Sequence, residues 1–434
     1  MRKDAHNYEE LALDYASAGC YDEALNVVDW AISVLESDTR MLHYYKAWFL
    51  RCMGRTDEAR DVAQTAELLP EDMYFPNSLE AILALQCVVE LLEHSPKANY
   101  LLGNIWYDKR QYDEAISAWE KSAAQDSSFP TVLRNLALAY FNKLGRTNDA
   151  LDMMEKAFAL NTDDARMLME LDQLYKRMNR EHKFRLELLE KYLEVVSKRD
   201  DLYLEYITLL NQCGEYEKAL KCIESRRFHP WEGGEGKVPA QYQTAHLQLA
   251  KQFMKDEEYN KAMEHIDACF EYPENLGEGK LHGAQENDFN YYKGCILEAL
   301  GDDEKAKEFF LKASTGISVP AAAVYYNDQK PDKIYYQGLA LRKLGCEDEA
   351  RGRFNRLIDF AEKHIFDVFK MDYFAVSLPD LQIWEDDMNR KNEVHCRYLL
   401  ALGYNGLGKV NAAQVEFAKV LEMDNNHPGA FVIE

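Results

Sequence analysis

Residues 96–129, PKANYLLGNIWYDKRQYDEAISAWEKSAAQDSSF, decide the fold of this chain. The stretch predicts two helices, 98–109 and 112–125, which are joined by a tight turn. Two small residues, Gly103 and Ala115, allow these helices to cross closely. Three large residues fill the space around the crossing: Trp106, Tyr112 and Trp119. A hairpin this short cannot bury its apolar face alone, so it needs a neighbour on each side.

The chain supplies those neighbours, because the alanine at the helix crossing recurs at regular intervals. These marker positions are Ala24, Ala59, Ala115, Ala150, Ala219, Ala262, Ala306, Ala350 and Ala413, with Phe184 standing in once. A second small residue stands twelve positions earlier in most hairpins. A glycine stands five positions before most markers, where the turn needs a left-handed backbone, although Asn179 replaces it once. Such matched spacing indicates repeated helical hairpins.

The spacing resembles the tetratricopeptide repeat (TPR), whose period is about 34 residues. The resemblance covers nearly the whole chain and implies an all-α fold. We therefore expect an α-α superhelix, a TPR solenoid of about ten helical hairpins, with irregular insertions in its C-terminal half.

The marker spacing also predicts how the chain is divided. Residues 1–70 hold the first two hairpins, and residues 71–95 form an irregular helical insertion. Residues 96–228 hold regular hairpins, whereas residues 229–434 hold hairpins with long insertions between them. We expect one continuous solenoid. Because the first repeat has no capping element before it, we also expect that residues upstream belong to the natural protein.

Composition excludes several classes of function. The formal net charge is −24, which disfavours nucleic-acid binding and anionic membrane surfaces. No apolar run approaches the length of a membrane span, and the N-terminus lacks a signal peptide pattern. Nine cysteines are dispersed without a paired spacing, as is typical of reduced thiols. These features predict a cytoplasmic protein.

Two of the insertions share the pattern P-x-x-x-G-E-G, beginning at Pro230 and Pro273. The two patterns lie 43 residues apart, which equals the local repeat period, so they should lie side by side on one edge of the solenoid. The candidate partner-binding residues of this edge are Arg227, His229, Trp231, Glu232, Glu235 and Glu278. A third insertion, 373–392, adds Trp384 as a candidate. The alternative, that the loops are rigid connectors and Trp231 fills a gap between repeats, stays open.

A tyrosine recurs fifteen residues before the marker in several hairpins. The set is Tyr44, Tyr100, Tyr291, Tyr335 and Tyr398. The TPR resemblance implies that this position lines the concave groove, where tyrosine offers stacking area and a hydroxyl to a peptide or carbohydrate. Packing between repeats is the alternative interpretation of each single tyrosine.

Catalytic and metal chemistry have weaker support. Glu232 or Glu235 could pair with Glu278, Asp386 or Asp387 for acid–base work on a sugar, but 75 acidic residues make chance proximity common. The histidines lack the spacing of a zinc site, and neither glycine-rich pattern fits a nucleotide-binding loop. We therefore expect no metal, no cofactor and no catalytic residue in this chain.

The irregular segments resemble a narrower group of bacterial proteins. The matching stretches are Phe75–Asn77, Arg226–Gly236, Tyr272–Lys280 and Asp372–Phe374. That group joins an N-terminal domain of unknown function, similar to the β-sandwich of aldose mutarotases, to a C-terminal TPR array. The resemblance implies a carbohydrate-related role, with the array docking onto such a β-domain.

Two functions follow from the sequence. The first is a scaffold that binds a protein or peptide partner and binds neither nucleic acid nor membrane; the resemblance implies the mutarotase-like domain or a carbohydrate as its partner. The second is the accessory half of a glycoside-processing enzyme, to which the loop carboxylates contribute.

Overall fold

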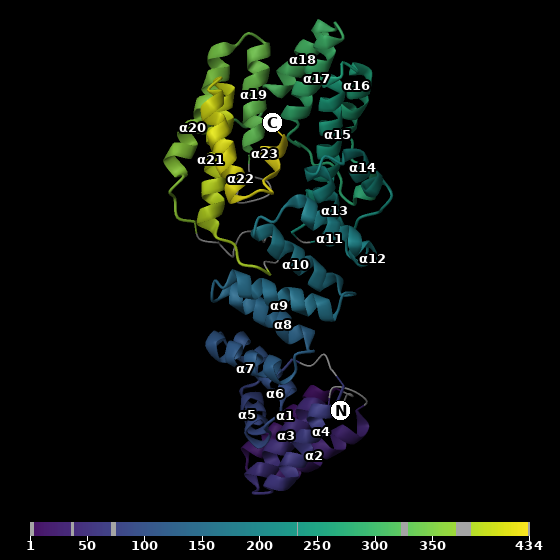
Figure 1. Cartoon of the computed structure of the whole chain (residues 1–434), viewed down its shortest axis with the longest axis vertical. Coiled ribbons are helices and arrows are strands. Elements are labelled where there is room, and N and C mark those ends of the chain that lie inside the picture. Colours follow the sequence, from purple (N-terminus) through teal and green to yellow (C-terminus); the bar gives the residue numbers. More distant parts are fainter. Residues whose placement is uncertain are drawn as a thin grey trace. The chain divides into compact units, whose positions relative to one another are not determined.

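The chain folds into helical hairpins, which confirms the predicted all-α TPR solenoid (Figure 1). The structure is a computed structural model that describes residues 4–35, 39–70, 75–231, 233–322, 329–369 and 383–432. Residues 1–167 and 168–434 form two compact units, called unit 1 and unit 2. The predicted divisions at residues 70, 95 and 228 stay predictions. None of the described helices is long and apolar enough to cross a membrane.

The described residues of unit 1 form four hairpins and one single helix. Its helices are α1 (Ala5–Ser17), α2 (Tyr21–Val34), α3 (Arg40–Cys52), α4 (Thr56–Leu68), α5 (Leu79–Leu91), α6 (Pro96–Asp108), α7 (Tyr112–Gln125), α8 (Pro130–Asn142) and α9 (Thr147–Leu160). The single helix α5 packs on α3 and on α6, so it links the second hairpin to the third.

Unit 2 begins within α10 (Ala165–Arg177) and has longer connections between its hairpins, as the sequence predicted. Its other helices are α11 (His182–Lys191), α12 (Leu193–Val196), α13 (Asp200–Gln212), α14 (Tyr216–Glu224), α15 (Lys237–Lys255), α16 (Tyr259–Ala268), α17 (Asn287–Ala299), α18 (Asp303–Ala313), α19 (Pro331–Lys343), α20 (Glu347–His364), α21 (Met388–Gly406), α22 (Val410–Met423) and α23 (Pro428–Val432). A 3-10 turn, η1 (Glu274–Leu276), lies between α16 and α17.

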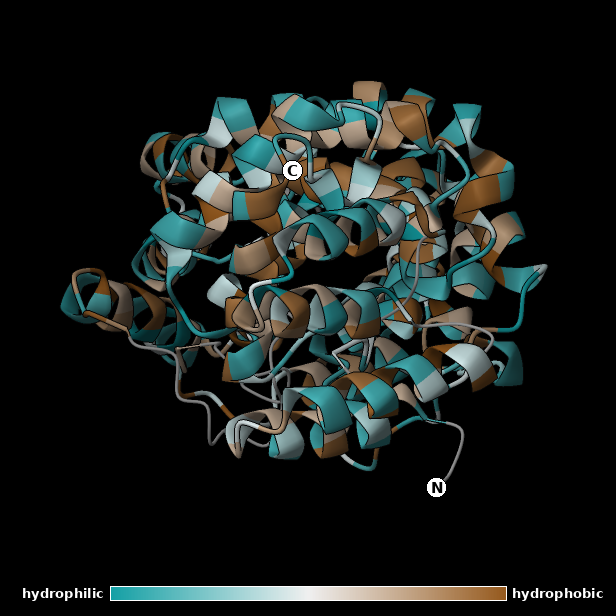
Figure 2. Cartoon of the chain, turned by 90° about the horizontal axis from the view of Figure 1, so that it is seen from below, coloured by the Kyte–Doolittle hydropathy of each residue, from teal (hydrophilic) through white to brown (hydrophobic). Residues whose placement is uncertain are grey.

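Small residues at the helix crossings are buried, as the marker spacing predicted. Ala24, Ala115 and Ala219, for example, have no exposed surface. In three hairpins a glycine of the first helix faces an aromatic ring sixteen residues later, so closely that an added Cβ would collide with it. These pairs are Gly103 with Trp119, Gly294 with Phe310, and Gly338 with Phe354. Figure 2 shows hydrophobic and hydrophilic residues alternating along the helices, as amphipathic packing requires.

The hairpin of α10 and α11 departs from the predicted register. Phe184, the expected stand-in for the marker alanine, is 45% exposed, whereas Arg185 is fully buried. Arg185 donates to both carboxylate oxygens of Asp172, at 2.9 and 2.7 Å, and to Glu205 at 2.7 Å. Although burial by itself lowers the pKa of Arg185, the two carboxylates outweigh it and raise that pKa. A charged group thus occupies a place that an apolar contact fills in the other hairpins.

The hairpin of α19 and α20 offers a test of the crossing geometry, because it contains two helical glycines in different surroundings. We expect Gly338→Ala to destabilise the protein by about 1–3 kcal/mol, since its methyl group would collide with buried Phe354. We expect the control Gly352→Ala to stabilise it by roughly 0.5–1 kcal/mol, because the added Cβ would meet no atom within 4 Å beyond its chain neighbours and the backbone of its own helix. Urea denaturation measures both, and equal effects of the two substitutions would contradict the close crossing.

Candidate functional site

The two loops with the shared P-x-x-x-G-E-G pattern lie side by side, which confirms their predicted placement. Loop A (residues 225–236) connects α14 to α15, and loop B (residues 269–286) connects α16 to α17. The backbone N–H of Phe228 donates to the carbonyl of Asn275 at 2.8 Å. The Asn275 side chain in turn donates to the carbonyls of Ile223 and Arg226, at 2.9 and 3.0 Å. Loop B therefore clamps the start of loop A.

The first glycine of each pattern provides a close approach between protein groups. An added Cβ on Gly234 would overlap the indole of Trp231, so this ring lies directly against the backbone of its own loop. Gly277, at φ +77°, would collide with the carbonyl oxygen of Phe228. Both loops are anchored by apolar side chains, since Phe228 and Leu276 are each 1% exposed. Gly234 therefore serves packing within loop A, and Gly277 serves the contact between the two loops.

Gly236, the second glycine of the P-x-x-x-G-E-G pattern in loop A, binds an anionic side chain of loop B. The N–H of Gly236 donates to the Glu278 carboxylate at 2.8 Å, and Gly236 has a φ of +72°. A turn with exposed N–H groups can bind anions, and here Glu278 occupies that position. This contact gives Glu278, a candidate ligand-binding residue, a role in joining the loops.

Asp200, at the start of α13, fixes the base of loop A. Its carboxylate accepts hydrogen bonds from the Arg226 guanidinium at 2.8 Å and from the His229 backbone N–H at 3.0 Å, and it lies 3.0 Å from His229 Nδ1. Burial raises the pKa of Asp200, but these hydrogen bonds outweigh it and hold the pKa below its usual value. The Arg226 guanidinium also lies 4.6 Å from the ring centre of Tyr203. These contacts anchor the first part of loop A, at Arg226 and His229, to the start of α13.

This anchoring leaves several candidate residues on the outside. The side chains of Arg227 and His229 are 71% and 80% exposed, Glu235 is exposed, and Trp231 is partly exposed. Arg227 lies 3.4 Å from Glu274 of loop B. Glu232 lies outside the described residues. The loops therefore present an aromatic face with charges of both signs beside it.

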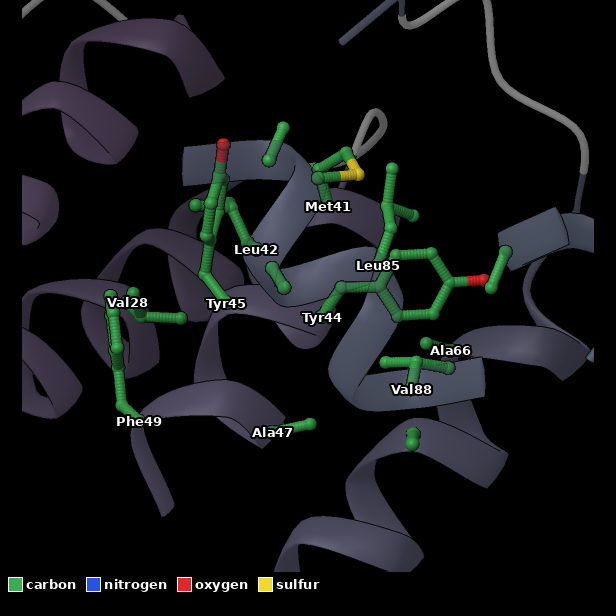
Figure 3. Packing of buried hydrophobic residues seen from close by; sticks show 14 of the residues in the cluster. Val28, Met41, Leu42, Tyr44, Tyr45, Ala47, Phe49, Ala66, Leu85 and Val88 are labelled. Carbon is green, nitrogen blue, oxygen red and sulfur yellow. The ribbon is translucent and has the colours of Figure 1, made fainter. Parts of the chain in front are cut away.

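The tyrosine set is less accessible than the loops. Tyr44, Tyr335 and Tyr398 are at most 7% exposed, whereas Tyr100 and Tyr291 are partly buried. The ring of Tyr44 lies among Ala66, Leu85 and Val88 in Figure 3. Its hydroxyl donates to Glu67 at 2.6 Å. Packing accounts for the three buried tyrosines, and a binding role for the set stays a prediction.

The third insertion lies partly outside the described residues, but its end packs into unit 2. Trp384 is fully buried and donates from Nε1 to the carbonyl of Glu170 at 2.9 Å. Asp386 pairs with Arg177 of α10 at 3.1 Å, and Asp387 caps α21. In this structure the candidate residue Trp384 offers no outer surface to a partner.

Two histidines outside the loops, His246 and His265, form a partly buried titratable pair. Nδ1 of His246 in α15 lies 2.9 Å from Nδ1 of His265 in α16, so one ring donates and the other accepts. Burial, and then the nearby His265, lower the pKa of His246 to about 4. No group of three or more potential metal ligands gathers anywhere in the described part of the chain.

Sequence reasoning missed the polar residues that hold the site together. Asp200 and Asn275 act through hydrogen bonds to residues 26 to 52 positions away, and an Asp or Asn near a turn carries no signal of such a partner. The sequence shows that Asn179 stands where most hairpins have a glycine, but it gives no sign of the residues to which the Asn179 side chain bonds.

Comparison with known proteins agrees with this architecture. Residues 77–130 and 288–315 each match a family model of the tetratricopeptide repeat. The chain contains tetratricopeptide repeats. A curated relative, the TPR repeat-containing protein YvcD of Bacillus subtilis (strain 168), is 26% identical over 151 residues, which are 32% of this chain and 30% of the relative. The chain therefore matches less than a third of that protein's length.

Three solved structures are similar to this chain at low identity. The C-terminal part of a TPR repeat-containing protein from Cytophaga hutchinsonii has 16% identity and a TM-score of 0.35, covering 63% of this chain and 99% of that one. YrrB, a TPR protein with an unusual peptide-binding site, has 15% identity and a TM-score of 0.29, covering 53% of this chain and 90% of that one. A structure of Naa15/Naa10 bound to HypK-THB has 14% identity and a TM-score of 0.35, covering 100% of this chain and 61% of that one. At these identities and TM-scores, the ligands and partners of those proteins are not assigned to this chain.

The histidine pair predicts a loss of stability in mild acid. His246 stays neutral in the folded protein, while the unfolded chain binds a proton at its ordinary pKa of about 6.5. Stability is therefore complete above pH 6.5, falls as the pH drops, and stops falling near pH 4, where the folded protein also binds the proton. The loss from this residue is roughly 3 kcal/mol.

Urea denaturation between pH 7.5 and 4 measures this effect. His246→Gln should reduce the loss of stability in acid, whereas the control His282→Gln removes an exposed imidazole of loop B and should leave the loss unchanged. The same slope in His246→Gln and in the parent protein would be incompatible with a buried neutral His246.

Proposed function

We propose that this chain is a protein-interaction scaffold, which binds a peptide or a protein segment along the edge formed by loops A and B. The observation that carries the proposal is the anchoring of loop A by Asp200, Asn275 and Glu278. An interface that is already ordered loses less conformational entropy when it binds a partner. Aromatic and arginine side chains are the residues that dominate binding energy in protein interfaces, and Trp231 and Arg227 stand at this edge.

The identity of the partner is a finer proposal, which comes from the resemblance of the loops to bacterial proteins with a mutarotase-like domain. We infer that the partner is a carbohydrate-related β-domain of the same or a neighbouring protein. All nine cysteines are free thiols, which supports a reducing compartment such as the cytoplasm.

Removal of the Trp231 indole tests the proposed binding edge. Peptides that bind the full chain would be selected from a phage-displayed library, and their affinity measured by fluorescence anisotropy. We expect Trp231→Ala to weaken binding by at least about tenfold, because a buried aromatic anchor is worth 2 kcal/mol or more. The control is Trp30→Ala, which removes a 54% exposed tryptophan from unit 1. Equal affinity of both variants would exclude the loops as the site, and failure to select any peptide would argue against the scaffold function itself.

The accessory-enzyme alternative makes a separate prediction about the loop carboxylates. If they complete a sugar-processing cleft, the chain mixed with a mutarotase-like domain should hydrolyse aryl glycosides, and Glu235→Gln with Glu278→Gln should abolish this activity. Glutamine at position 278 retains an oxygen that can accept from the Gly236 N–H, so the loops should stay joined. Activity that survives the double substitution would remove this alternative.

A further inference from the structure

The segment after α22 returns to the first helices of unit 2. Asn426 donates from its side chain to the Lys176 carbonyl at the end of α10, at 3.3 Å. Its own carbonyl accepts from Gln212 at the end of α13, at 3.4 Å. Asn425 donates to the Asn179 carbonyl at 2.9 Å. These contacts join residues more than 200 positions apart within one unit, where an open solenoid would have only neighbouring repeats in contact.

Asn179 explains why one hairpin turn lacks its glycine. The residue has a φ of +52°, which asparagine tolerates better than most side chains. Its side-chain nitrogen donates to the carbonyls of Glu422 and Met423, each at 3.1 Å, and its oxygen accepts from the Asn425 N–H at 3.2 Å. Asparagine thus keeps the left-handed turn and adds three hydrogen bonds to the other end of the unit that glycine cannot make.

The buried Arg185 is a fourth residue, after Lys176, Gln212 and Asn179, that contacts the segment following α22. Its Nε and Nη2 atoms are directed at Asp172 and Glu205, while Nη1 donates to the side-chain oxygen of Asn426 at 2.7 Å. Arg185 is 0% exposed and Asn426 is 7% exposed. Because a guanidinium has donors on all three nitrogens, Asn426 satisfies a direction that the carboxylates leave open. Without it, a buried charged group would lose a hydrogen bond.

The end of the third insertion makes a second connection to the same helices. Arg177 of α10 donates to the Trp384 carbonyl at 3.2 Å and pairs with Asp386, while the buried Trp384 indole donates to Glu170. Two segments near the end of the chain therefore hold α10. The C-terminal helices, yellow in Figure 1, and the blue-green helices α11 to α13 belong to the same unit, to which most of α10 also belongs.

We propose that residues 422–427 form a clasp that closes unit 2 into a ring, with Asn179, Arg185 and Asn426 as its key contacts. Opening the clasp is a single conformational step, in which the start and the end of the unit lose protection together. In an open array of repeats, each end would fray independently of the other. The proposal does not depend on the partner that binds loops A and B.

Asn179→Gly tests the clasp without straining the turn, because glycine adopts a positive φ readily. We expect native-state hydrogen exchange at residues 422–430, and at the turn after α10, to become at least about tenfold faster. Glu257→Gly is the matched control, since Glu257 occupies the corresponding turn between α15 and α16 at φ +61°. Its backbone N–H bonds within that turn, to the Met254 carbonyl, and not to residues 422–427. This control should leave the exchange of residues 422–430 unchanged.

A second variant decides the matter if Asn179→Gly unfolds the unit. Asn426→Ser introduces the residue that stands at the equivalent place before α8, where Ser128 also bonds through its N–H to an aspartate two residues earlier. The local turn should therefore persist while the contacts with Arg185 and Lys176 are lost. Faster exchange at both ends of unit 2 supports the clasp. Unchanged exchange in Asn426→Ser, acceleration at one end only, or the same acceleration in Glu257→Gly would overturn it.

Discussion

The close crossing of two short helices is the constraint on which the rest of this structure depends. A small residue must stand where the helices meet, and in three hairpins the aromatic ring of the second helix lies directly against the backbone of the first, as Phe354 does against Gly338. In these hairpins the close contact constrains the angle at which the two helices cross. Successive hairpins then bury the apolar faces that none could bury alone.

Once the crossings are fixed, the connections between hairpins are free to vary, and unit 2 uses this freedom for polar contacts. Loops A and B are joined by backbone and side-chain hydrogen bonds in addition to the buried side chains of Phe228 and Leu276. Their glycines bring Trp231 onto Gly234 and loop B onto Phe228. Order in these loops thus comes from many directional bonds, which explains how they present exposed charged side chains without becoming part of the core.

Buried charge has a different role within unit 2, where the segment after α22 meets α10 and α11. The Arg185 cluster places charged groups where other hairpins place an alanine, and such groups are tolerated only when every donor and acceptor has a partner. Lys176 balances Glu205 at 2.9 Å, and Asn426 completes the guanidinium. Hydrogen-bond geometry is directional, so this cluster specifies which segment meets the start of the unit more sharply than apolar packing would.

The sequence by itself determined the repeat, the all-α class and the adjacency of loops A and B, because these follow from the spacing of residues along the chain. A period of small residues identifies a helix crossing whatever the partner, as at Gly103 and Ala115. Only the tertiary structure decided that Arg185 and not Phe184 is buried, that Tyr44 and Trp384 are enclosed, and that Asn179 reaches Asn425. Those outcomes depend on contacts between residues up to 246 positions apart. No local pattern encodes such a contact, since the residues involved are polar groups whose partners are set only when the repeats have stacked.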